Sequence, residues 1–187
     1  MVFHRPNPRL IVFPPELQNI ERVNNFKLLG IQLHPDFNFS DYVTTLVTTC
    51  NQRLNLIYQL RQQGLGLHET DMVFKSIVLS KITYAIPMLF GYLTEDHIKQ
   101  ICSIFKKAMK WQLTLQEYDF RSIAENIQCN LFQQSKSSSH CLFHLYRPSL
   151  NTSSMMLRNR GHNFFVPSVK FYFNSKNFIA RALSQYR

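Results

Sequence analysis

The sequence predicts an α+β fold that is mainly helical, and three observations lead to this class. The first 38 residues are rich in proline and β-forming residues, which favours a small N-terminal β-hairpin. Residues 39–134 carry apolar side chains at helical spacing, which predicts a bundle of three or four helices. Residues 135–187 open with a polar break, Ser135–Ser139, and show no sustained period, so we expect an irregular C-terminal tail.

Two short strands are expected in the N-terminal part. Met1–His4 and Lys27–Leu33 have β-forming composition, and Gly30 in the second run indicates a bulge or a close backbone approach. Between the two runs lies a connection interrupted by prolines, which cannot donate to a β-ladder: Pro6, Pro8, Pro14 and Pro15. We therefore expect these two runs to form the hairpin.

The first two helices follow from the spacing of their apolar residues. One helix is expected from Ser40, a suitable N-cap, and Gly64 and Gly66 mark its end. The second should begin near residues 69–71 and run to residue 84 or 86, where Pro87 ends or kinks it. Its apolar residues surround most of the helix, which indicates a buried central position.

Two further helices have recognisable starts. Thr94 is a good N-cap, and Glu95 and Asp96 after it complement the positive end of a helix. A shorter helix is expected from Asp119. The residues expected in the core between the first three helices are Leu46, Val47, Leu54, Ile77, Val78, Ile98, Ile101 and Phe105.

The chain is basic, and its charge is unevenly distributed. It carries 21 Lys and Arg against 11 Asp and Glu, a formal net charge of +10. Residues 126–187 contain eight bases and no acid, whereas the thirteen bases and eleven acids before them nearly balance. An excess of this kind favours a polyanionic partner, with nucleic acid ahead of an anionic membrane surface.

Other features of the sequence argue against a secreted or membrane protein. The longest uncharged run, Ile82–Thr94, has thirteen residues, against the roughly 20 apolar residues that a spanning helix needs. The N-terminal residues have no apolar stretch typical of a secretory signal. Four scattered cysteines without a CxxC pair are typical of reduced thiols. We expect an intracellular protein without a membrane partner.

The sequence offers no catalytic or metal-binding residue that we would single out. Metal-dependent nucleotidyl transfer needs two or three converging carboxylates, and the one adjacent acid pair, Glu95–Asp96, is explained by its place in the first turn of a helix. Cys129, His140, Cys141 and His144 lack the closely paired spacing of a zinc site. We therefore expect no catalytic residue, no metal and no cofactor, although an unrecognised enzyme remains an alternative.

Two groups of basic residues are candidates for binding nucleic acid. The first comprises lysines outside the apolar stripe of the third helix: Lys99, Lys106, Lys107 and Lys110. They are either a solvated helix face or contacts to phosphates. In the tail, Arg158 and Arg160 precede Phe164 and Phe165, a combination that suits phosphates and unstacked bases. The tail phenylalanines could instead pack back on the helices, and the two interpretations are compatible.

Three segments, in order, resemble one family. Residues 26–65, FKLLGIQLHPDFNFSDYVTTLVTTCNQRLNLIYQLRQQGL, resemble the stretch that follows the palm in non-LTR (LINE-type) retrotransposon reverse transcriptases. VFKSIVLSKITYAIPMLFG, residues 73–91, is similar to the next helix of that family. LRNRGHNFFVP and NFIARAL, at residues 157–167 and 177–183, resemble its C-terminal ending.

The resemblance implies three parts: a residual palm-edge hairpin over residues 1–38, a helical thumb over 39–134 and a connector over 135–187. The catalytic aspartates of the family would precede Met1, so we expect a truncated, non-catalytic portion of an RNA-directed DNA polymerase. Such a thumb would grip the template–primer duplex without sequence preference. The surface that faces the palm in the family would favour self-association. The alternative is a domesticated retroelement remnant that acts as a protein-interaction module.

Overall fold

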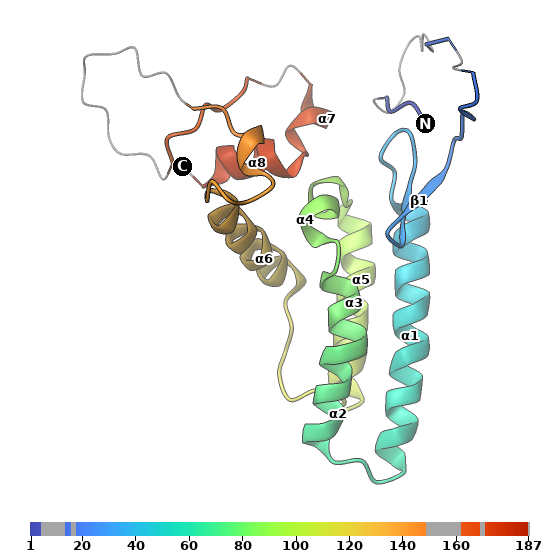
Figure 1. Cartoon of the computed structure of the whole chain (residues 1–187). Coiled ribbons are helices and arrows are strands. Elements are labelled where there is room, and N and C mark those ends of the chain that lie inside the picture. Colours follow the sequence, from blue (N-terminus) through green and yellow to red (C-terminus); the bar gives the residue numbers. More distant parts are fainter. Residues whose placement is uncertain (5–13, 16–17, 149–161, 169–170, 187) are drawn as a thin grey trace. The chain divides into compact units, whose positions relative to one another are not determined.

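The computed structural model describes residues 1–4, 14–15, 18–148, 162–168 and 171–186 (Figure 1). The chain forms two compact units: residues 1–85 with 92–120, and residues 86–91 with 121–187. The described residues are mainly helical and contain a two-stranded antiparallel hairpin, which confirms the expected fold class. Both units are discontinuous in sequence, because residues 86–91 belong with the C-terminal part of the chain.

The hairpin is more local than the sequence suggested. Its strands are β1, Phe26–Leu28, and β2, Ile31–Leu33, so both come from the run that was expected to be one strand. The turn between them consists of Leu29 and Gly30, both at positive φ (48° and 81°), as a tight two-residue hairpin requires. Residues 1–4 form no strand, and the expected pairing of Met1–His4 with Lys27–Leu33 was wrong because this turn closes the hairpin earlier.

The long helix α1 spans Ser40–Gln62. Phe39, rather than Ser40, is the N-cap, and the Asn38 side chain accepts hydrogen bonds from the Ser40 backbone N–H (2.9 Å) and hydroxyl (2.7 Å). Gly64 follows the helix with a φ of 101°, in agreement with its expected role as a stop. The apolar face of α1 is buried along its length through Tyr42, Val43, Leu46, Cys50, Leu54 and Ile57.

The second helical stretch contains a π-helical turn that the sequence did not predict. It consists of α2, Leu67–Phe74, the π-helix η1, Lys75–Leu79, and α3, Ser80–Thr83. A π turn displaces carbonyl groups from the regular helical hydrogen-bond ladder. The Ile77 carbonyl of this turn accepts a hydrogen bond from the Arg53 guanidinium of α1, which joins the two helical stretches at this point.

One apolar stretch, Leu67–Tyr92, is long and apolar enough to cross a membrane by length and composition alone. It has 26 residues, and a third of its most apolar 18-residue window is buried within the structure. Core helices of soluble proteins meet the same criterion.

Pro87 does not stop helix formation, since it lies in the first turn of the short α4, Ile86–Leu89. The 3₁₀ turn η2, Phe90–Tyr92, follows α4.

Helix α5, Glu95–Lys110, begins as expected at Thr94. The Thr94 hydroxyl accepts a hydrogen bond from the His97 backbone N–H (3.3 Å), and His97 Nδ1 accepts one from the Thr94 backbone N–H (3.3 Å). Because Nδ1 is an acceptor, the ring proton lies on Nε2, which donates to the Ser40 hydroxyl at 3.2 Å. His97 therefore connects the start of α5 to the start of α1.

Six of the eight expected core residues are buried: Leu46, Leu54, Val78, Ile98, Ile101 and Phe105. Val47 and Ile77 are only half-buried. Ile77 lies within the π turn η1, where helical spacing no longer predicts the buried face. The core of the first unit also contains Ile104 and Ala108 of α5, and it is therefore shared by α1, the α2–η1–α3 stretch and α5.

A buried carboxylate fixes the loop that follows α5. Asp71 of α2 accepts hydrogen bonds from the Thr114 hydroxyl (2.7 Å) and the Leu115 backbone N–H (3.2 Å), and it forms an ion pair with Lys75 (2.7 Å). Burial acts to raise the pKa of Asp71, but the hydrogen bonds from Lys75, Thr114 and Leu115 outweigh it and hold the pKa below its ordinary value. The ionised carboxylate thus anchors this loop to α2.

The second unit has its own small core. Helix α6, Phe120–Ser135, corresponds to the expected fourth helix, and most of it belongs to this unit rather than to the bundle. The expected irregular tail contains, in its described part, the 3₁₀ turn η3, Phe143–Leu145, and the helices α7, Tyr172–Ser175, and α8, Phe178–Gln185. The buried residues of this core are Phe132, Tyr146, Ala182 and Leu183.

Replacing Ile101 by Asp should unfold the first unit. Ile101 is only 2% exposed and lies on the inner face of α5. An unpaired buried charge costs several kcal/mol, comparable with the roughly 5–15 kcal/mol that stabilises a typical domain. Circular dichroism should show no cooperative melt at the wild-type temperature. Ser103→Asp, on the exposed side of the same helix, is the matched control, and equal melting of the two variants would mean that the inner face is misassigned.

Stability should fall as the pH drops below about 6.5, the ordinary pKa of histidine. Burial lowers the pKa of His97 in the folded chain, while the charge of Asp96 acts in the opposite direction. Between the lowered and the ordinary pKa the unfolded chain binds a proton that the folded chain does not, so acid favours unfolding. Protonation of Nδ1 would also break its bond to Thr94.

Urea unfolding at pH 7.5 and 5.5 measures this effect. His97→Gln is the matched variant, because glutamine is a suitable residue at the third position of a capping box and does not titrate. It should retain the helix start and lose part of the pH dependence. A pH dependence identical to that of the wild type would assign the effect to other groups.

Candidate nucleic-acid interface

Helix α5 presents a stripe of basic side chains opposite its buried face. Lys99, Lys106 and Lys110 are exposed and separated by seven and four residues, so they share one side of the helix with the exposed Ser103. With a rise of about 1.5 Å per residue, the stripe extends roughly 16 Å along the axis. We call Lys99, Lys106 and Lys110 the lysine stripe. The fourth predicted lysine, Lys107, lies next to it.

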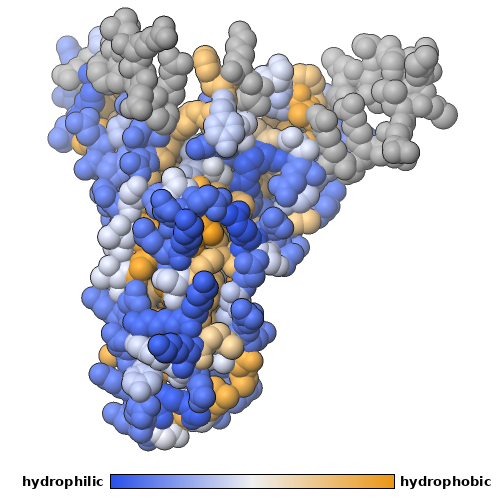
Figure 2. Space-filling view, turned by 180° about the vertical axis from the view of Figure 1, so that it is seen from behind, coloured by the Kyte–Doolittle hydropathy of each residue, from blue (hydrophilic) through white to orange (hydrophobic). Residues whose placement is uncertain are grey.

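The lysine stripe carries little compensating negative charge. Lys99 forms an ion pair with Asp96 at 3.2 Å, and both side chains are exposed, so the pair contributes little to stability. Within the described ranges no ion pair joins Lys106 or Lys110 to an acid. Their charges are therefore available to a phosphate backbone. Figure 2 shows hydrophilic residues over much of the visible surface, with smaller hydrophobic patches between them.

Lys107 has a different environment from the lysine stripe. Its ammonium group donates to the Asn51 side-chain oxygen of α1 at 3.1 Å and lies 4.3 Å from the centroid of the Trp111 ring. The Tyr58 ring lies 4.9 Å from Trp111, tilted by 43°. Tyr58 is exposed and Trp111 half-buried, so an aromatic pair with a cation lies at the C-terminal end of α5. Such a pair suits stacking with an unpaired base.

Neither Trp111 nor Tyr58 was among the residues predicted to bind nucleic acid. Trp111 follows Lys110 directly, so its place at the end of a lysine-rich helix could have indicated a role in binding nucleic acid. Tyr58 could not have been found in this way, because its contact to Trp111 joins the ends of two helices that are distant in sequence. Only the packing of α5 on α1 brings the pair together.

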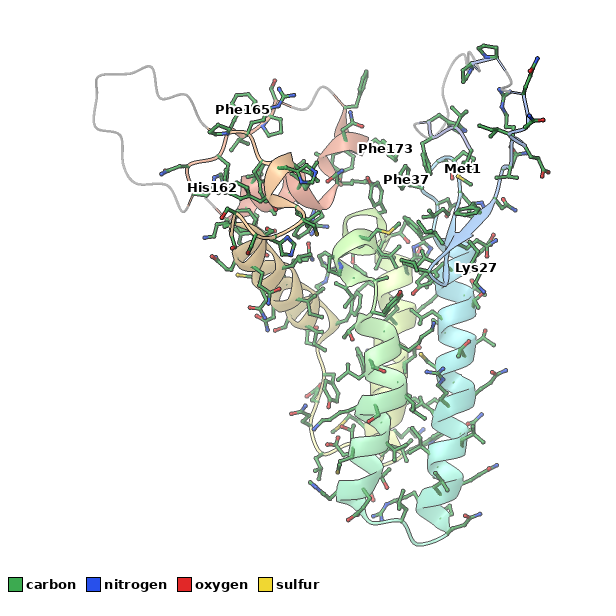
Figure 3. All side chains as sticks on the ribbon, in the orientation of Figure 1. Met1, Lys27, Phe37, His162, Phe165 and Phe173 are labelled. Atoms are coloured by element: carbon green, nitrogen blue, oxygen red, sulfur yellow. The ribbon has the colours of Figure 1, made fainter. Side chains whose placement is uncertain are left out.

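The second group of predicted residues, Arg158 and Arg160, lies outside the described residues. The aromatic residues of the described tail divide into two sets. Phe164 and Phe178 pack against the core of the second unit, whereas Phe165 and Phe171 are exposed. Figure 3 marks Phe165 and His162, a buried histidine whose Nε2 lies 2.9 Å from the Leu183 carbonyl oxygen.

Basic residues of the second unit lie against aromatic rings. Lys136 lies 5.6 Å from the Phe132 ring centroid, Lys176 lies 5.3 Å from that of Tyr172, and Arg181 lies 5.1 Å from that of Phe90. These contacts bury part of the stems of the cations while leaving charge near the surface. In the described part of the tail, Phe164 and Phe178 pack on the core of the second unit, as one of the two interpretations expected. The same part of the chain also contains cation–aromatic contacts.

Potential metal ligands do not converge in the part of the chain that the structure describes. No group of three or more His, Cys, Asp or Glu side chains there could hold a metal ion. Cys141 lies 4.0 Å from His140 Nδ1 and is exposed, and Cys50, Cys102 and Cys129 are also free thiols.

No protein-family model, curated protein or solved structure matches the chain.

Proposed function

We propose that this chain binds nucleic acid without catalysing a reaction, by contacting the phosphate backbone of a template–primer duplex. The observation that carries the proposal is the lysine stripe of α5, in which Lys106 and Lys110 have no acidic partner among the described residues. Lysines along a rigid helix can neutralise several phosphates of one strand, and this contact does not read sequence. The net charge of +10 adds long-range attraction for any polyanion.

The proposal includes an origin for the chain. We propose that it is a portion of a non-LTR retrotransposon reverse transcriptase that resembles the thumb and connector of that enzyme. Its support is the order of the three resembling segments in the sequence. A helical bundle preceded by a small hairpin agrees with what this resemblance implies. In an intact enzyme of that family, the reaction would be RNA-templated DNA synthesis.

A second function, a protein-interaction module, is favoured by exposed apolar side chains of the first unit. Leu56 and Leu60, four residues apart on α1, are 57% and 43% exposed, and Met72 of α2 is 56% exposed. Large apolar side chains at the surface are typical of protein contacts and of self-association. This function predicts binding that depends weakly on salt, whereas phosphate neutralisation predicts a steep dependence.

Changing Lys106, Lys107 and Lys110 together to Gln should weaken binding to every duplex. Glutamine keeps the helix propensity close to that of lysine and removes three charges. Each phosphate contact on duplex DNA contributes roughly −0.9 to the log–log salt slope, so the slope should become shallower by about 2 to 3. Fluorescence anisotropy at salt concentrations from about 50 to about 300 mM measures both the affinity and the salt slope.

The matched control is the triple change of the same lysines to Arg, which retains the charge and the helix propensity. It should bind with the wild-type slope. Arg158→Gln with Arg160→Gln is the companion test for the tail. If neither glutamine variant alters the affinity or the slope, the interaction-module function replaces nucleic-acid binding.

The purified chain should not incorporate nucleotides on any template–primer with Mg²⁺ or Mn²⁺. Two-metal catalysis needs converging carboxylates, and Asp71, the buried carboxylate among the described residues, is already engaged by Lys75, Thr114 and Leu115. Primer extension, with an intact reverse transcriptase as the positive control, is the measurement. Template-dependent and metal-dependent extension by the chain alone would refute the non-catalytic assignment.

A further inference from the structure

A second basic feature of the first unit is a cleft between the hairpin, α1 and α3. Its volume is about 220 Å³. Figure 3 shows Lys27 on β1 beside the first turns of α1, which form the opposite side of the cleft. The residues that line it come from the hairpin, from α1 and from α3, and they include Lys27, Arg53 and Lys81.

Three cations meet in this cleft, and no carboxylate lines it. Lys27 comes from β1, Arg53 from α1 and Lys81 from α3. Within the described residues, the ammonium groups of Lys27 and Lys81 form no hydrogen bond or ion pair. Cations that are drawn together without an acid repel one another, and a bound anion removes this repulsion.

Arg53 is the fixed member of the three. It is half-buried, and one of its guanidinium nitrogens donates to the Ile77 carbonyl of the π turn η1. A guanidinium has five N–H groups in a planar fork, so donors remain for a second acceptor. Burial raises the pKa of the Cys50 thiol to about 11, and the charges of Arg53 and Lys81 oppose this rise. Both cations therefore act on the same part of α1.

Hydroxyl and amide groups complete a donor set around the cations. Tyr42 and Thr45 of α1 line the cleft, and their hydroxyls form no hydrogen bond with any other described residue. Thr49 is not part of this donor set, because its hydroxyl proton is donated to the Thr45 carbonyl at 2.8 Å. Gln32 of β2 adds an amide. Arginine, lysine and hydroxyl donors converging in one place are the groups with which proteins bind phosphate.

We propose that this cleft binds a phosphate group. Its large apolar lining residues are Leu46 and Tyr42, whereas three of its nine lining residues are cations, so the chemistry that the cleft recognises is that of an oxyanion. Two sources could supply it: free inorganic phosphate or pyrophosphate, and the terminal phosphate of a nucleic acid strand. The site shares no residue with the lysine stripe, so the two can be tested separately.

The test is a titration of the full chain with inorganic phosphate and with pyrophosphate, followed by amide NMR shifts and calorimetry. The wild type should bind pyrophosphate saturably, with the largest shifts at residues of the cleft. Lys27→Gln with Lys81→Gln should lose about a hundred-fold in affinity, since each of the two lost charge-assisted hydrogen bonds contributes a factor of about ten or more. Neither ammonium group forms a hydrogen bond or an ion pair among the described residues, so the variant should fold.

Two controls decide the interpretation. Lys27→Arg with Lys81→Arg should retain binding, and Lys106→Gln with Lys110→Gln, on the lysine stripe, should leave pyrophosphate affinity unchanged. Equal losses in the cleft and stripe variants would overturn the proposal, because they would indicate only a general attraction for anions. Absence of saturable binding to both phosphate compounds and to a 5′-phosphorylated oligonucleotide would overturn it as well.

The source of the phosphate follows from a final comparison. A single-stranded oligonucleotide carrying a 5′-phosphate is compared with the same strand ending in a hydroxyl. A preference for the phosphorylated strand that the cleft variant loses supports a nucleic-acid end as the ligand. Pyrophosphate binding without such a preference supports a free phosphate compound. Loss of duplex binding in the stripe variant alone concerns the proposed function and leaves the cleft unaffected.

Discussion

Burial of the apolar face of α5 against α1 is the interaction on which the first unit depends. Ile101, Ile104 and Phe105 supply the inner side of α5, and the 3.6-residue period then requires the lysine stripe to face outward. The same packing brings His97 to Ser40 at one end of the two helices. It also brings Lys107, in the last turn of α5, to Asn51 in the middle of α1. One hydrophobic contact thus fixes the position of the charges that we assign to nucleic-acid binding.

The sequence predicted correctly those features of the fold that depend on residues close together in the chain. Apolar spacing located the three main helices of the first unit, and Thr94 was correctly assigned as an N-cap because capping depends on neighbouring residues. The hairpin partner was wrong, since composition alone did not reveal that Leu29 and Gly30 could close a tight turn. The π turn at Lys75–Leu79 and the cleft could not be predicted, because both depend on contacts between segments far apart in the chain.

The two basic features of the first unit differ in how they are built. The lysine stripe consists of long, exposed side chains that a ligand must order at a cost in entropy. In the cleft, Arg53 is already held by the Ile77 carbonyl, and the walls come from three elements of the fold. A preorganised site favours one small anion, whereas the mobile stripe adapts to a long polyanion of any sequence.

The late position of α5 in the first unit has a consequence for biosynthesis. The apolar faces of α1 and of the α2–η1–α3 stretch are completed only by α5, whose last residue is Lys110, and residues 86–91 in between belong to the second unit. At about 5–20 residues per second, the delay between the end of α1 and the end of α5 lasts roughly 2–10 s. During that interval the apolar side chains that pack against α5 in the folded unit have no partner, so the nascent chain exposes apolar surface that favours aggregation.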